Sequence, residues 1–145
     1  MKKHINLIIA LLIISASSFG QTADDVICVF TKKENGKVFT KNEDGSRFVN
    51  FVISGIKSDQ QAFVLKENVK KSAFISEFTI SDEMKNNERK AYMSIKKGTK
   101  VDALSKLLMD NGINYIKLDD KISKVSELKS KAEKKQEKMK DPNKP

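Results

Sequence analysis

The sequence has few of the side chains on which most catalytic and metal sites depend. Its 145 residues include one cysteine, one histidine and no tryptophan. One cysteine excludes an internal disulfide framework, and one cysteine with one histidine excludes a zinc site of the usual four cysteine and histidine ligands. Small disulfide-stapled scaffolds and zinc modules are therefore ruled out.

Long apolar runs are also scarce, and the first residues of the chain carry the longest. A positive start at Met1–Lys3 precedes an apolar run at 5–14 and a stretch of small residues at 15–20. Ten apolar residues are too few for a permanent span of about 20. This order is typical of a cleavable secretory signal peptide, residues 1–20, with cleavage expected after Gly20.

The expected signal peptide sets the location of the mature protein. It resembles the export signals of Gram-negative Bacteroidetes, which implies a periplasmic or secreted protein. A lipid anchor is not expected, because Cys28 follows Asp24, Asp25 and the bulky Ile27 instead of small residues.

Cleavage would also remove His4, the single histidine. The mature sequence has no Gly-x-Ser-x-Gly elbow, no Ser-x-x-Lys signature and no glycine-rich phosphate loop. Without histidine the usual nucleophile-and-base pairs cannot be composed. We therefore expect a protein that is not an enzyme and that carries no cofactor.

The basic excess lies mostly in the last part of the chain. Residues 121–145 hold nine lysines against four acidic residues, although the whole chain carries a net charge of +9. Ile122, Val125 and Leu128 are spaced by three, which predicts a lysine-rich helical tail that ends near Asp141. Such a tail is typical of a solvated segment. The alternative is weak electrostatic contact with an anionic membrane or polysaccharide.

Nucleic acid is not an expected partner on this evidence. A nucleic-acid face should interleave basic and aromatic residues on the strands of the folded part. The linear sequence shows no such stripe.

Turn signals divide the beginning of the mature chain. Asn35-Gly36 and Asp44-Gly45 favour tight β-turns. They predict strands at 28–33, 37–41 and 47–54, with residues 21–46 forming a β-hairpin extension. Cys28 lies in the first of these apolar runs, where it is expected to be buried, an intermolecular bridge being the alternative.

Residues 47–120 alternate between strand and helix periodicity. The β-branched and aromatic segment 47–54 predicts a strand, and helical spacing of apolar residues follows from Ala62 to Ala73, with Ser58 or Asp59 as the cap. Strands are expected at 74–80 and 91–95, a helix from 101 to Asn111-Gly112, and a last strand at 115–118. The order β-α-β-β-α-β predicts an α+β fold, a ferredoxin-like βαββαβ sandwich.

One loop of this region makes it similar to a known family. Gly55-Ile56-Lys57-Ser58-Asp59-Gln60-Gln61 falls where the heavy-metal-associated domain family has Gly-Met-x-Cys-x-x-Cys. Gly55 and Ile56 match the glycine and the buried methionine, whereas Ser58 and Gln61 take the two cysteine positions. The late Gly-Tyr pair of the family is echoed by Gly112-Ile113, with Tyr115 nearby. The resemblance implies a metal-binding ancestry without the metal ligands.

No other ligand set replaces the missing cysteines. Cu(I) and Hg(II) require soft thiolates, and a hydroxyl and an amide do not supply them. The methionines of the mature chain are spread over a loop, a strand, a helix and the tail: Met84, Met93, Met109 and Met139. The acidic pairs Asp24-Asp25, Asp82-Glu83 and Asp119-Asp120 lack the spacing of a calcium loop. We therefore expect no metal site.

The leading hypothesis is an exported, non-enzymatic binding module that contacts an envelope protein, with Ser58, Gln61 and Tyr115 as interaction candidates. A first alternative is a periplasmic metal carrier that uses Met84, Met93, Cys28 or ligands of a partner. A second alternative is a protease-inhibitor-like or chaperone-like module, because some propeptides with a ferredoxin-like fold block proteases.

Overall fold

A computed structural model describes residues 25–128 and 133–134 of the chain. The expected signal peptide and its cleavage site, and most of the expected tail, lie outside the described residues. Within the described part, no helix combines the length and the apolar character that a membrane crossing requires.

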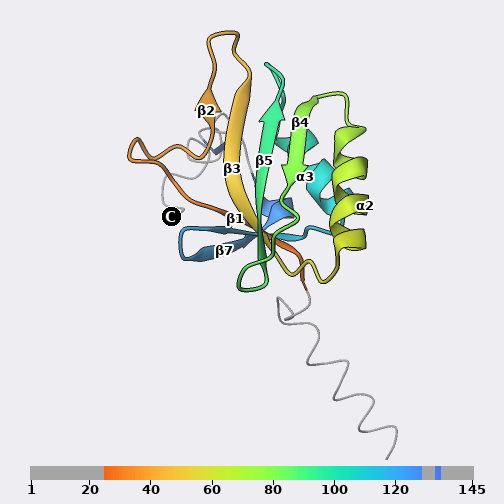
Figure 1. The fold of residues 1–145 in the computed structure, drawn as a ribbon. Helices are drawn as coiled ribbons and strands as arrows, with labels where there is room; N and C mark the ends of the chain where they lie inside the picture. The colour runs from red at the N-terminus through yellow and green to blue at the C-terminus, as the bar shows by residue number, and fades with distance from the viewer. Residues whose placement is uncertain (1–24, 129–132, 135–145) are drawn as a thin grey trace, which may run out of the picture.

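The fold is mixed α+β, with a seven-stranded sheet and two α-helices in residues 25–128 (Figure 1). The sheet order is β4-β5-β3-β1-β6-β7, and β2 pairs with β3 outside this path. The elements along the chain are β1 (Ile27–Phe30), β2 (Thr40–Lys41), β3 (Arg47–Ser54), α2 (Asp59–Lys70), β4 (Ile75–Ile80), β5 (Glu88–Ile95), α3 (Val101–Asp110), β6 (Tyr115–Leu118), β7 (Lys121–Lys124) and the 3-10 turn η1 (Val125–Glu127).

The predicted β-α-β-β-α-β order is confirmed by β3, α2, β4, β5, α3 and β6. The expected pairing of β4 with β5 is confirmed and is antiparallel. β5 starts three residues earlier than predicted, at Glu88. The reason is a tight turn in which Asn86 and Asn87 both adopt positive φ, 54° and 61°, a conformation that asparagine tolerates better than most residues. The following residues can therefore join the sheet at once.

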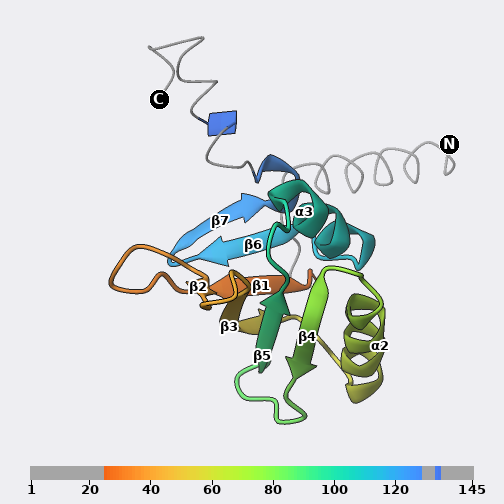
Figure 2. The ribbon, with the colours of Figure 1, turned by 90° about the horizontal axis from the view of Figure 1, so that it is seen from above.

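The predicted N-terminal β-hairpin is wrong. β1 does not pair with β2: it lies between β3, to which it is antiparallel, and β6, to which it is parallel. β2 pairs with the other end of β3, where Thr40 faces Phe48. β1 and β2 thus run along β3 as one interrupted strand, and residues 31–39 leave the sheet between them (Figure 2). The cause is burial, because the apolar residues of β1 fill the middle of the sheet.

This position of β1 distinguishes the sheet from the expected one. In a split βαβ arrangement the outer members of the unit, here β3 and β6, are direct neighbours. In this sheet β1 separates them. The structure therefore establishes an α+β fold with a single sheet. It does not by itself establish the ferredoxin-like fold.

The helical expectation for the start of the tail is also wrong. Residues 121–124 form β7, which is antiparallel to β6, and residues 125–127 form the turn η1. Asp119 has φ 53° and begins the tight turn between the two strands, an arrangement that Asp tolerates better than most residues. The three-residue spacing of Ile122, Val125 and Leu128 is explained by a strand followed by a turn. Val125 is fully buried, whereas Ile122 is 44% exposed.

The sheet has one face covered by helices and one open face. Alternate residues of β3 point to the helices, where Val49, Phe51 and Ile53 join the core with Ala62, Leu65 and Val69 of α2 and Leu108 of α3. Both helices lie on this side (Figure 2). The intervening residues form what we call the open face. Its residues are Phe48, Asn50, Val52 and Ser54 of β3, Lys90, Tyr92 and Ser94 of β5, Ile27 and Val29 of β1, Tyr115 and Lys117 of β6, and Ile122 and Lys124 of β7. Two of them, Ile27 and Ser94, are nevertheless buried.

Candidate functional site

The loop between β3 and α2 begins at a position that only glycine fits. Gly55 has φ +88°, and a Cβ atom there would lie 2.3 Å from the backbone oxygen of Asp25. Its N–H donates to the backbone oxygen of Asn87 at 3.4 Å. Ile56, 1% exposed, follows in the core. The first two residues of the loop therefore have structural roles, since one permits a close backbone approach and the other anchors the loop.

Ser58 and Gln61, the residues at the two expected ligand positions, form the cap of α2. The Oγ of Ser58 accepts a hydrogen bond from the Gln61 N–H at 3.1 Å. The Oε1 of Gln61 accepts one from the Lys57 N–H at 2.8 Å. This resembles a capping box, in which two side chains satisfy free N–H groups at a helix start. Both residues are exposed, so the cap presents polar groups to solvent.

These two residues also line a groove, which we call the α2–α3 groove. Its volume is about 500 Å³. The lining residues are Val26, Ser58, Gln60, Gln61, Val64, Leu65, Asn68, Asp110 and Asn111. Val64 is 46% exposed although it is apolar. The lining thus combines three apolar side chains with amide, hydroxyl and carboxylate groups, a mixture that protein contact surfaces also have.

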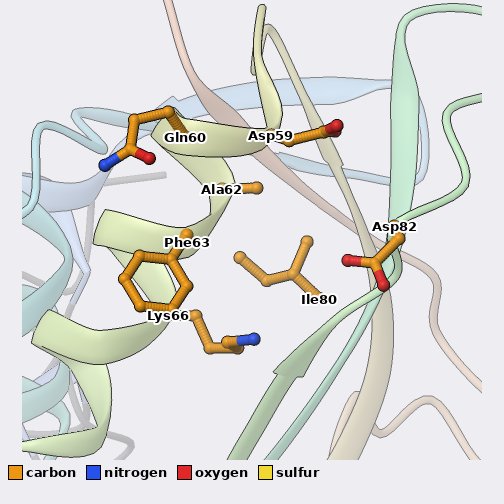
Figure 3. A pocket seen from close by; sticks show the side chains of 7 residues that line it. All are labelled: Asp59, Gln60, Ala62, Phe63, Lys66, Ile80 and Asp82. Atoms are coloured by element: carbon orange, nitrogen blue, oxygen red, sulfur yellow. The ribbon is translucent and has the colours of Figure 1, made fainter.

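A second hollow lies on the other side of the same helix (Figure 3). Its volume is about 290 Å³, and Ala62 and Ile80 form its apolar part. Figure 3 shows Asp82 and Lys66 on opposite sides of Ile80. Phe63 is 53% exposed at its margin, with the Lys66 ammonium 5.6 Å from the ring centroid. Phe63 and Val64 are thus neighbours in sequence that serve different hollows.

A buried arginine fixes the start of α2. Arg89 is 3% exposed, and its Nη2 lies 2.7 Å from Oδ1 of Asp59. Its Nη1 donates to the backbone oxygens of Ser81 and Asp82 at 3.3 and 3.1 Å. The guanidinium thus joins β5, the β4–β5 connection and α2. Because Asp59 balances this buried charge, its carboxylate serves the fold.

Tyr115, the third interaction candidate, is in a different environment. It starts β6, where its cross-strand neighbours are Ile27 and Lys124. It is half-buried on the open face and does not line the α2–α3 groove. The structure therefore brings Ser58 and Gln61 together and places Tyr115 on another surface.

Cys28 is in the core, as predicted. It is a free thiol, 1% exposed, and burial raises its pKa to about 12. A thiol must lose its proton to bind a soft metal, and this environment opposes that loss.

The other soft or acidic side chains do not converge either. Met93 is buried in the core, whereas Met84 and Met109 are 52% and 37% exposed on a loop and on α3. Asp119 is engaged with the N–H of Lys32 at 3.2 Å and with its ammonium at 3.7 Å. In residues 25–128 and 133–134, no three His, Cys, Asp or Glu side chains are grouped so that they could hold a metal ion.

The open face contains residues that were not candidates from the sequence. Phe48 and Tyr92 are neighbours there, with ring centroids 6.0 Å apart. Lys33 lies over Phe48, 5.4 Å from the ring centroid, and its ammonium donates to the Thr40 hydroxyl. The sequence signal is the alternation of lysine and tyrosine at 90 and 92 and again at 115 and 117. Each alternation spans only three residues of one strand. The lysines and tyrosines of the two strands share one surface only because of the sheet register.

No family model matches this chain, and comparison with the curated proteins and with the solved structures found no match. The class of protein is therefore given by its fold, an α+β domain.

Proposed function

We propose that the protein is an exported, non-enzymatic binding module that contacts an envelope protein through the α2–α3 groove. The observation that carries this proposal is the exposed apolar Val64 in a groove lined by both apolar and polar side chains. Exposed apolar side chains surrounded by hydrogen-bonding groups are typical of protein contact surfaces.

The groove is well suited to rigid recognition. Ser58 and Gln61 are held by the helix cap, and the Arg89–Asp59 pair fixes the same end of α2. A partner would therefore meet side chains that are already ordered, which lowers the entropy lost on binding. The backbone and amide groups of the groove can form directional hydrogen bonds with a partner, and Val64 contributes apolar contact area.

Ancestry is part of the proposal. We regard β3, α2, β4, β5, α3 and β6 as a ferredoxin-like unit related to heavy-metal-associated domains, with β1 added between β3 and β6. The loop 55–61 supports this, because its glycine and buried isoleucine keep their positions while Ser58 and Gln61 cap the helix. On this view a helix cap has replaced the metal site.

The proposal is tested by photo-crosslinking in envelope extract. A photoreactive phenylalanine analogue is placed at position 64 and, as a matched control, at position 63. Both residues are exposed on α2, at 46% and 53%, but they line different hollows. We expect one defined cross-linked protein from position 64 only.

The identified partner then gives an affinity measurement. Val64→Glu should weaken its binding at least tenfold, because it places a charge in the apolar centre of the contact. Phe63→Glu should change it less than twofold. Equal cross-linking from both positions, or equal losses in both variants, would contradict the proposal.

A further inference from the structure

The open face of the sheet gathers aromatic and basic side chains from four strands. Phe48 and Tyr92 lie side by side on β3 and β5. Lys90 and Lys117 stand in one cross-strand row, separated by Val52 and Val29.

A neighbouring row adds a second aromatic and basic pair. Tyr115 stands beside Lys124, and Lys33 lies over Phe48 at the other end of the face. The sheet register thus produces the interleaving that the linear sequence does not show.

The acidic side chains of the open face lie toward one margin of the sheet, and two of its lysines lie toward the opposite margin. The acidic side chains on the same side of the sheet, Glu77 and Glu88, belong to the β4–β5 margin. Lys117 and Lys124 belong to β6 and β7 at the opposite margin. A negatively charged chain is therefore attracted across β3, β1 and β6 and not toward β4.

We propose that the open face binds single-stranded nucleic acid without sequence preference. Lysines neutralise phosphates, and aromatic rings stack on the flat bases whatever their sequence. A sulfated glycan or a lipid headgroup offers charge without a flat ring. The combination of three rings with lysines therefore favours a nucleic acid among the polyanions.

The dimensions of the face fit several nucleotides. Adjacent strands are about 4.8 Å apart and a strand rises about 3.4 Å per residue, so Tyr92 and Tyr115 lie roughly 20 Å apart along the diagonal. A short single strand covers this span. The site is separate from the α2–α3 groove, because neither tyrosine lines it.

The first test uses the purified wild-type protein. The chain has two tyrosines and no tryptophan, and both tyrosines lie on the open face. Intrinsic tyrosine fluorescence therefore reports on the proposed surface alone. Twelve-residue oligothymidine should quench it in a saturable way, after correction for absorption with free tyrosine. If a direct binding measurement shows that the protein is saturated with oligothymidine and its tyrosine fluorescence is still not quenched, the proposal is overturned.

The second test separates the lysines of this surface from lysines elsewhere on the folded part. Fluorescence anisotropy of labelled oligothymidine is measured with Lys117→Gln/Lys124→Gln and with the matched variant Lys70→Gln/Lys71→Gln, which loses the same charge on α2 and its end. The first pair should weaken binding about tenfold and reduce the salt slope by about 1.4. The second should change affinity less than twofold. Equal losses, or no binding by the wild type, would overturn the proposal.

The third test distinguishes nucleic acid from a sulfated glycan. Tyr92→Leu keeps apolar area on the strand and removes the aromatic ring. It should weaken oligothymidine binding about fivefold or more and leave the affinity for a heparin oligosaccharide unchanged. If both ligands lose affinity equally, or neither does, base stacking is not part of the site and the proposal fails.

Discussion

The two faces of the sheet are built from alternate residues of the same strands and have opposite characters. In β3, Ile53 has no exposed surface and packs under the helices, whereas Val52 beside it is half-buried on the open face. The helix side holds the core, the Arg89–Asp59 pair and the α2–α3 groove. The open side holds the Phe48–Tyr92 pair, with Lys33 over the Phe48 ring. Stability and polyanion recognition are therefore expected to respond to different substitutions.

The strongest test of this difference compares two neighbours in β3. Ile53→Ala should lower the free energy of unfolding by about 2–5 kcal/mol, because it leaves a cavity in a closed core. Val52→Ala should cost about 1 kcal/mol, because less apolar area is lost from a half-open site. Urea unfolding followed by circular dichroism measures both. Similar costs for the two variants would mean that the open face is covered.

Substitutions at two glycines with positive φ allow a packed turn to be compared with an open one. Gly55→Ala should lower the free energy of unfolding by about 3 kcal/mol. The added Cβ makes the left-handed backbone conformation unfavourable and also clashes with the Asp25 carbonyl. Gly36→Ala, with φ +72° and no atom within 4 Å of its added Cβ, should cost about 1 kcal/mol. Thermal unfolding of the two variants gives the comparison. If they are equally stable, the close approach of Gly55 to residue 25 is not a constraint.

The helix cap predicts a smaller effect. Ser58→Ala removes the acceptor for the Gln61 N–H and should cost about 1 kcal/mol. Ser54→Ala, a few residues earlier on the open face, should stay within about 0.5 kcal/mol of the wild type. Denaturant unfolding distinguishes them. A cost for Ser58→Ala below that of Ser54→Ala would remove the structural role assigned to the cap.

The thiol on the helix side predicts an energetic effect that appears only at alkaline pH. Burial raises the pKa of Cys28 from 9.0 to about 12, so the native state keeps its proton when the unfolded state loses it. Its contribution to stability is fully present below pH 9.0 and is lost as the pH rises toward about 12. The stability difference between the wild type and Cys28→Ala should therefore narrow over this range, which unfolding at successive pH values measures.

The same thiol gives a direct comparison of the two faces in β1. At pH 8, native Cys28 should react with a thiol reagent orders of magnitude more slowly than the denatured protein. The double variant Cys28→Ala/Val29→Cys moves the thiol to the open face, where it should react much faster. Equal rates for the two positions would show that β1 is not placed between β3 and β6 as described.

Local signals in the sequence were enough for much of this fold. The spacing of apolar residues predicts α2 and α3, and the sequence offers Ser58 or Asp59 as the cap of α2. The bond from the Gln61 N–H to the Ser58 hydroxyl identifies Ser58 as the cap. The burial of Cys28 followed from its apolar neighbours. These properties depend on residues close in sequence, which is why a pattern could reveal them.

Pairing between distant segments could not be predicted in this way. β1 joins β6 across almost 90 residues, and nothing local in 27–30 specifies a parallel partner. The spacing of Ile122, Val125 and Leu128 predicts a helix, but a strand at 121–124 followed by a turn has the same spacing. The open face was missed for the same reason, since its residues meet only through the register.

The most direct test of the division between the two faces is an amide chemical-shift titration of the ¹⁵N-labelled protein with twelve-residue oligothymidine. We expect shifts centred on the open-face residues of β3, β5 and β6, among them Phe48, Tyr92 and Lys117, with the amides of α2 unchanged. Shifts confined to residues after 128, or centred on the α2–α3 groove, would contradict it.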